Sequence, residues 1–334
     1  MKKSTLFLTS VFLLGTFFLE SVEAQNGSVC LEDNLPHWLD WRTEEAKANH
    51  FRERLLKSPV RTALVVIGAL LIVLLNALLC FLLYKDGSFW SQRTYRMIFS
   101  LAVNDCLTGV LLLIGVLTEM KSVQKMIGEL GCKLVIAGLW LCVTTSIYTF
   151  TVISIARWLI LNHGTFYREN VEKKPMWKVH LAIVVCWLAG ACHAVPLLTP
   201  WNNDCVTDFN TCSLPYKSPL WIWGSAIFVF FLPSLVIVIV YTLILLKLQA
   251  DRHVNMAAGY QVTKTMSLLT AAFLLCWWPL GIYLSVQWNT VGGTRGFYAG
   301  AISSLVNPVV IIWVNPQLYS RVAAMFRGIN SYRN

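Results

Sequence analysis

Residues 60–84 read VRTALVVIGALLIVLLNALLCFLLY, a run whose only strongly polar side chains are Arg61, Thr62 and Asn76. A helix needs about 20 mostly apolar residues to cross the hydrocarbon core of a bilayer, so this stretch predicts a membrane-spanning helix. The whole chain has a matching composition: of 334 residues, 56% are hydrophobic and 13% are charged. Soluble domains carry roughly 25% charged residues. The composition therefore excludes a disordered protein and argues against a soluble enzyme.

Seven segments are long and apolar enough to span a membrane. They are Val60–Tyr84, Met97–Thr118, Lys133–Ile160, Val179–Leu198, Pro219–Leu246, Val262–Val286 and Phe297–Val314. After the last of them, Pro316–Arg327 places Leu318, Val322 and Phe326 at helical spacing beside Arg321, which is typical of a helix lying on a membrane surface. We expect an all-α membrane protein: a seven-transmembrane helix bundle with a short amphipathic C-terminal surface helix.

The N-terminus has the pattern of a secretory signal peptide. Lys2 and Lys3 precede the apolar stretch Leu6–Leu19, and Val22–Ala24 is a suitable cleavage site. The alternative is a signal anchor that stays attached. The polar stretch that follows contains the sequon Asn26-Gly27-Ser28, which predicts glycosylation at Asn26.

Four regions follow from these patterns. They are a signal peptide at 1–24, an extracellular segment at 25–58, the seven-span domain at 59–315, and an amphipathic helix with a short tail at 316–334.

The net charge of +10 comes from 27 Lys and Arg against 17 Asp and Glu. With the N-terminus outside, the cytoplasmic segments hold fourteen basic and four acidic residues, and the outer segments hold eleven and ten. This excess on one side follows the positive-inside rule. We expect a multi-pass plasma-membrane protein with an extracellular N-terminus, whose basic face meets membrane lipids and not nucleic acid.

One ordered set of residues runs through all seven spans. It comprises Asn76, Leu101–Asp105, Cys132, Arg157, Trp187, Pro196, Pro233, Tyr241, Phe273, Cys276–Pro279 and Asn307–Pro308. In this set the chain resembles the rhodopsin-like (class A) G-protein-coupled receptors over roughly Pro59–Phe326. The resemblance implies a receptor that converts binding of an extracellular ligand into signalling by a heterotrimeric G protein, and not an enzyme.

The same resemblance implies roles for the polar and kinked positions. The activation switch would comprise Arg157, Tyr241, Phe273, Trp277, Pro279, Asn307 and Pro308. A sodium ion, the only cofactor implied, would be held by Asp105, Ser146, Ser303, Ser304 and Asn307. The alternative is a protonated Asp105 held only by hydrogen bonds, because an isolated buried charge is costly.

Two positions depart from the family pattern. Ala156 stands where the family has an acid beside Arg157, and Ile311 stands where it has a tyrosine after Asn307-Pro308. We expect a weaker resting latch on Arg157 and raised basal activity. A receptor-like protein with lost or atypical G-protein coupling remains an alternative.

Four cysteines fall on the predicted outer side: Cys30, Cys132, Cys205 and Cys212. The resemblance implies the disulfide Cys132–Cys212, with Cys30–Cys205 as a second pair, although the three ways of pairing four cysteines stay open. The six cysteines within the spans are expected to be free thiols.

The outer half of the bundle is the expected ligand cavity. Its candidate residues are Leu139, Trp140, Thr144, Trp221, Trp277, Trp278, Tyr283 and Ala301. By resemblance, Leu139 disfavours an amine ligand and Ala301 disfavours a retinal-binding receptor, which leaves a peptide or another small molecule. A seven-helix transporter or channel is the alternative from another class, although no internal repeat supports it.

Overall fold

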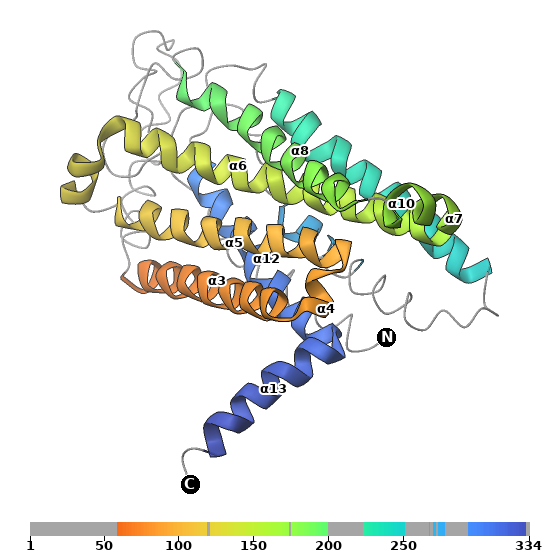
Figure 1. The fold of residues 1–334 in the computed structure, drawn as a ribbon. Coiled ribbons are helices and arrows are strands. Elements are labelled where there is room, and N and C mark those ends of the chain that lie inside the picture. Colours follow the sequence, from red (N-terminus) through yellow and green to blue (C-terminus); the bar gives the residue numbers. More distant parts are fainter. Residues whose placement is uncertain are drawn as a thin grey trace.

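The computed structural model describes residues 59–118, 121–173, 175–199, 223–250, 267, 270–271, 273–277 and 293–331. Within these ranges the chain forms a bundle of long helices, α3, α5, α6, α8, α10 and α12, with α13 leaving the bundle at one end (Figure 1). The predicted signal peptide, the extracellular segment with Asn26, and most of the sixth span lie outside the described residues.

The first two spans form a close pair. Helix α3 (Pro59–Lys85) matches the predicted first span, and the one-turn helix α4 (Gly87–Trp90) leads into α5 (Arg93–Leu117). Helix α5 begins before the predicted start at Met97 because its first turn is polar, and hydropathy does not register a polar turn. At Gly109 a Cβ would lie 2.8 Å from Val73 Cγ2, so glycine lets the two helices approach.

The third and fourth spans pack along each other. Helix α6 (Lys121–Asn162) contains the predicted span and continues beyond it, with a break at Gly128, whose φ of 68° suits glycine. Helix α8 (Trp177–Ala194) tightens into the 3₁₀ turn η3 (Val195–Leu198). At Gly190 a Cβ would lie 2.8 Å from the Leu141 carbonyl oxygen of α6.

The remaining spans are irregular. The fifth starts as the wide π-helical segment η4 (Ser225–Phe231) and continues as α10 (Leu232–Ala250). Of the predicted sixth span, residues 267, 270–271 and 273–277 are described, and they are helical. The seventh is α12 (Gly293–Val314), which contains Pro308.

Five helices within the described residues are long and apolar enough to cross a membrane: Thr62–Lys85, Arg93–Leu117, Leu130–Asn162, Trp177–Leu198 and Ser225–Lys247. A sixth candidate is a bent pair, Ala301–Val314 with Pro316–Met325, whose two parts meet at 97°. This bend directs α13 (Pro316–Ser331) away from the bundle, as a helix on the membrane surface requires.

Large apolar side chains occupy both the interior and the outer surface of the bundle. Trp140 is fully buried and Phe150 and Phe273 are 1% exposed, whereas Leu74 is 63% exposed and Leu235 56% exposed. So many exposed apolar side chains are unfavourable in water and are expected where a helix faces lipid.

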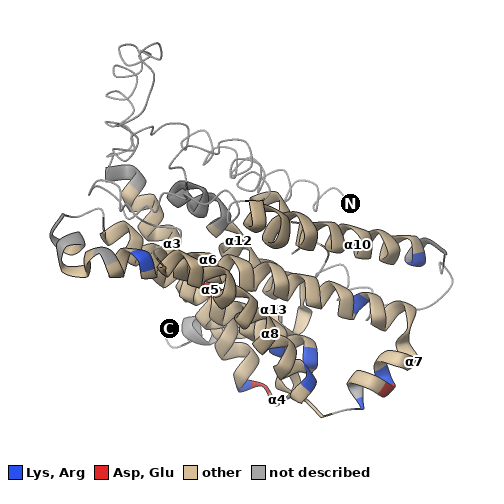
Figure 2. Ribbon diagram, turned by 90° about the horizontal axis from the view of Figure 1, so that it is seen from above, with Lys and Arg blue, Asp and Glu red and all other residues tan. Residues whose placement is uncertain are grey.

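Positive charge gathers at one end of the bundle, called here the basic end and defined by Lys85, Arg93, Arg157, Lys178 and Lys247. Figure 2 shows most of the described Lys and Arg near α4, α7 (Gly164–Tyr167) and α13 or at the nearby helix ends. The positive-inside count predicts that this end is cytoplasmic.

Candidate functional site

The centre of the bundle holds a buried carboxylate with two hydrogen-bond donors. Asp105 of α5 is 1% exposed. Its Oδ1 accepts a hydrogen bond of 2.7 Å from Ser304 Oγ, and its Oδ2 accepts one of 2.8 Å from Asn307 Nδ2. Both donors come from α12, so this carboxylate fixes the seventh helix against the second.

Two buried amides extend the cluster to the first and third helices. Asn76 of α3 donates to the Ser304 carbonyl oxygen at 2.9 Å. Asn104 of α5 donates to Ser146 Oγ at 2.8 Å and to the Cys142 carbonyl oxygen at 3.0 Å. Four helices therefore meet at hydrogen bonds that lipid cannot replace, which makes this cluster the polar core of the bundle.

The predicted sodium ligands are only partly brought together. Ser304 and Asn307 contact Asp105, whereas Ser146 bonds Asn104 and Ser303 bonds Trp277. The side-chain oxygens of Asn76, Asn104 and Asn307 are buried without a hydrogen-bond partner. Carbonyl and carboxylate oxygens are the ligands that hard cations prefer, so the chemistry of this group fits a sodium ion.

Trp277, of the sixth span, is hydrogen-bonded to the same turn of α12. Its indole Nε1 donates to Ser303 Oγ at 2.9 Å, one residue before the serine that bonds Asp105. The centroid of its ring lies 6.1 Å from that of Phe273 and 6.5 Å from that of Phe230 of η4. Phe273 in turn lies 4.8 Å from Phe150 of α6. The predicted switch residues Trp277 and Phe273 thus belong to one aromatic contact chain that crosses three spans.

The described ligand candidates are buried between helices. Leu139, Thr144, Trp277 and Ala301 are at most 4% exposed and Trp140 is fully buried. The remaining candidates, Trp221, Trp278 and Tyr283, lie outside the described residues, as does the switch residue Pro279. The predicted ligand cavity therefore stays a prediction.

A histidine that was not among the predicted site residues joins three of these helices. His193 Nδ1 lies 2.9 Å from Thr144 Oγ1, and its Nε2 lies 2.7 Å from Ser225 Oγ. Because Thr144 already donates its hydroxyl hydrogen to the Trp140 carbonyl, it accepts from His193 Nδ1–H. The neutral ring then accepts from Ser225. Helical spacing around His193 gave no signal for this pairing, since its partners lie on other spans.

At the basic end, Arg157 of α6 has a neutral partner. Its Nη2 donates to Thr94 Oγ1 of α5, and the neighbouring Ala156 carries only a methyl group. Tyr241, another predicted switch residue, shares a hydrogen bond of 3.3 Å with Thr270 of the sixth span. The sequence identified Arg157 but not Thr94, because a threonine at the start of a helix carries no distinctive pattern.

Ile311, at the position where the family pattern has a tyrosine, packs among apolar side chains. Ile311 is 2% exposed and belongs to the apolar core. A different phenol takes a polar role nearby: Tyr95 OH accepts a 2.6 Å hydrogen bond from Asn315 Nδ2. Asn315 also caps α13, accepting at Oδ1 from the backbone N–H of Gln317 and Leu318 at 3.0 and 3.2 Å.

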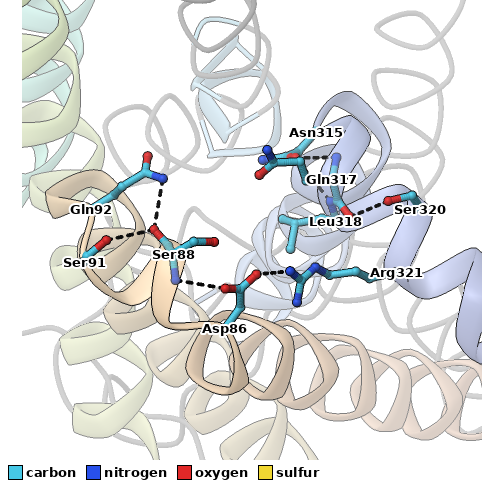
Figure 3. Close-up of polar contacts among 9 residues, drawn as sticks. All are labelled: Asp86, Ser88, Ser91, Gln92, Asn315, Gln317, Leu318, Ser320 and Arg321. Carbon is cyan, nitrogen blue, oxygen red and sulfur yellow. Dashed lines mark hydrogen bonds and ion pairs between the residues drawn. The ribbon is translucent and has the colours of Figure 1, made fainter.

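A second contact, drawn in Figure 3, joins α13 to Asp86, the residue that caps the start of α4. Arg321 of α13 pairs with the Asp86 carboxylate, which also accepts from the Ser88 backbone N–H at 2.9 Å. The guanidinium stands 5.5 Å from the Phe89 ring, and Leu318 is fully buried beneath. Hydrogen bonds from Ser88 and the charge of Arg321 hold the pKa of Asp86 below its usual value.

The cysteines within the spans are free thiols, as expected: Cys80, Cys106, Cys142, Cys186, Cys192 and Cys276. Cys132 of α6 is disulfide-bonded. Cys30, Cys205 and Cys212 lie outside the described residues, so the pairing Cys132–Cys212 stays a prediction.

The long lipid-facing helices and their buried polar core define a helical protein that crosses a membrane several times. Residues 49–319 match the sequence profile of the rhodopsin family of seven-transmembrane receptors, and the chain belongs to that family. Its fold is accordingly a seven-helix bundle, with the sixth span mostly outside the described residues. Receptors of this family are not enzymes and act in G-protein-coupled signalling, which decides against the transporter or channel alternative.

Proposed function

We propose that this chain is a plasma-membrane receptor whose N-terminus is extracellular and whose basic end engages a heterotrimeric G protein. The gathering of described Lys and Arg at that end supports the orientation. A peptide is the proposed ligand class. It is supported by charges near the predicted outer mouth, at Glu119, Lys133, Lys217 and Arg295, above an apolar aromatic floor.

One observation supports the signalling role: the sixth span and the second span both form hydrogen bonds to the same turn of α12. Ser303 accepts from Trp277, and the adjacent Ser304 donates to Asp105. A displacement of the sixth span at Trp277 therefore acts directly on the helix that holds the Asp105 cluster. Ligand binding above Trp277 would shift the population between two arrangements of these contacts.

The Asp105 cluster supports the proposed sodium site. Asp105 would hold the ion together with Ser146, Ser303, Ser304 and Asn307, and the buried side-chain oxygen of Asn307, which has no described hydrogen-bond partner, supports this set. The ion would supply a positive charge that stabilises the buried carboxylate. Ser304 and Asn307 orient that carboxylate from α12.

Arg157 supports G-protein engagement with a weak resting latch. A guanidinium bonds a carboxylate more strongly than a neutral hydroxyl, and Thr94 offers only the hydroxyl. Arg157 is therefore released at lower cost than in a chain with an acid at position 156. The receptor is proposed to signal at a measurable level without ligand.

The test is a G-protein dissociation assay in cells exposed to peptide and metabolite pools. Ser303→Ala removes the acceptor of Trp277 and is expected to weaken the ligand response about fivefold, the equivalent of one buried hydrogen bond. The matched control is Ser234→Ala, because Ser234 Oγ is buried without a hydrogen-bond partner. Ligand-dependent uptake or current with no G-protein dissociation would overturn the proposal.

A further inference from the structure

A cavity of about 220 Å³ opens at the basic end, between α5, α6, α8 and the turn formed by α7 and η2 (Arg168–Glu172). It is separate from the Asp105 cluster and from the ligand candidates. Its described lining is Arg93, Thr94, Met97, Val152, Ile153, Ile155, Ala156, Leu159, Tyr167, Val171, Lys178, Val179 and Ala182.

The lining is apolar on most of its surface and has positive charge but no negative charge among its described residues. Arg93 of α5 and Lys178 of α8 supply the basic groups. Lys178 Nζ donates to the Asn170 carbonyl oxygen at 2.7 Å and stands 6.0 Å from the Trp177 ring. Neither contact neutralises its charge, so the cavity favours an anionic occupant.

Ala156 keeps the cavity free of the acid that the family pattern places there. It lines the cavity beside Thr94, which accepts the hydrogen bond from Arg157. An aspartate at this position would introduce a carboxylate into the lining. Alanine at position 156 therefore leaves the described lining of the cavity without an acidic residue.

The surroundings of the cavity are those of a lipid-facing surface. Ile155, which lines it, is 38% exposed, and Trp177 and Leu181 of α8 are 55% and 51% exposed. Tryptophan and lysine together at a helix end are typical of the membrane interface, where the chain meets both lipid tails and headgroups. An amphiphile can thus reach the apolar lining from the bilayer.

We propose that this cavity binds an anionic phospholipid of the leaflet at the basic end. The headgroup phosphate meets Lys178 and Arg93, and the start of an acyl chain lies against Met97, Val152 and Val179. The volume is below the roughly 300–1,000 Å³ of pockets for drug-sized ligands and suits part of one chain. That this leaflet is the cytoplasmic one rests on the orientation given under Proposed function.

The test is native mass spectrometry of the purified full chain in detergent, titrated with dioctanoyl phosphatidylserine, dioctanoyl phosphatidylcholine or inorganic phosphate. We expect phosphatidylserine to bind more tightly than the other two. Lys178→Gln and Arg93→Gln should each weaken it about fivefold, since one basic group near a membrane surface contributes about 1 kcal/mol. Lys85→Gln, at the same end but outside the described lining, should change it less than twofold.

Ala182→Phe, which fills the cavity without changing its charge, should also reduce phosphatidylserine binding, with folding checked by thermal unfolding. Equal binding of phosphatidylcholine, equal competition by inorganic phosphate, or equal losses in the Lys85 and Lys178 variants would each overturn the proposal. Neither the extracellular ligand nor a G protein takes part in this measurement. Its failure is therefore distinct from a failure of the proposed signalling role.

Discussion

Asp105 in the middle of the bundle and Arg157 at its basic end are held in different ways. The carboxylate is 1% exposed and receives hydrogen bonds from two side chains of α12. The guanidinium is partly exposed and donates to the single hydroxyl of Thr94. The first arrangement is costly to break because lipid offers no replacement, whereas the second can exchange with water or headgroups.

The contacts of Asp105 are therefore a structural constraint on the bundle, whereas the contact of Arg157 is adjustable. Any membrane bundle that buries a carboxylate must satisfy it, so the Asp105 cluster keeps its partners on neighbouring helices. The arginine at the membrane edge is not constrained in this way, and the chain has replaced its acid by Ala156. The predictions below test whether the two regions respond as differently as these contacts imply.

The largest effect is expected for Asp105→Asn. The amide turns one acceptor into a donor that faces Ser304 or Asn307, at a cost of about 1–3 kcal/mol for the unsatisfied pair. Thermal unfolding of the purified chain should shift down, and ligand-driven G-protein dissociation should fall about tenfold. Unchanged basal and ligand-driven signalling would contradict the proposed role of this cluster.

A smaller effect is expected for Ala156→Asp. The new carboxylate would lie beside Arg157 and restrain it, lowering ligand-independent signalling about fivefold, as for an ion pair of about 1 kcal/mol. Basal G-protein dissociation at matched surface expression measures this. Ala156→Asn, similar in size but uncharged, is the control; an equal drop in both variants would assign the effect to size and not to charge.

Thr94→Ala should act in the opposite direction. It removes the acceptor of Arg157 and should raise basal signalling about threefold, because a partly exposed guanidinium recovers much of the lost hydrogen bond from water. Thr94→Ser keeps the hydroxyl and should behave as the unaltered chain. If the alanine variant also matches the unaltered chain, Thr94 is no part of the latch.

The smallest effect is expected at the contact between Asp86 and Arg321. Hydrogen bonds from Ser88 and the charge of Arg321 lower the pKa of Asp86, so the contact is present above the usual aspartate pKa of about 4 and is lost as the pH falls below it. Spin-label distances between α4 and α13 should therefore be constant from pH 5 to 8. Asp86→Asn should change signalling less than twofold, since ion pairs at the protein surface contribute little.

The long apolar helices could be predicted from the sequence because their signal is local. The prediction Val60–Tyr84 differs from α3 (Pro59–Lys85) by one residue at each end. The break in α6 at Gly128 and the wide turns of η4 were not predicted, since they depend on packing between spans. The surface helix was predicted from its apolar spacing, and it extends beyond Arg327 to Ser331.

The candidate site was predicted where the family pattern names a residue and missed where a partner is fixed by packing. Asp105, Ser304 and Asn307 were predicted together and lie together. His193 with its partner Ser225, and Thr94 with Arg157, join residues far apart in the chain that no spacing rule relates. The family pattern names Arg157, which is charged, but not its neutral partner Thr94.

The central claim is that this chain couples to a G protein and that, among the described residues, Arg157 is held by the neutral hydroxyl of Thr94. The most direct measurement is nucleotide exchange on purified heterotrimeric G proteins of each class, with the full chain in lipid nanodiscs and without ligand. We predict exchange above that of empty nanodiscs for at least one class, and a return toward that baseline with Ala156→Asp. Exchange equal to empty nanodiscs for every class, with and without the substitution, would contradict the account.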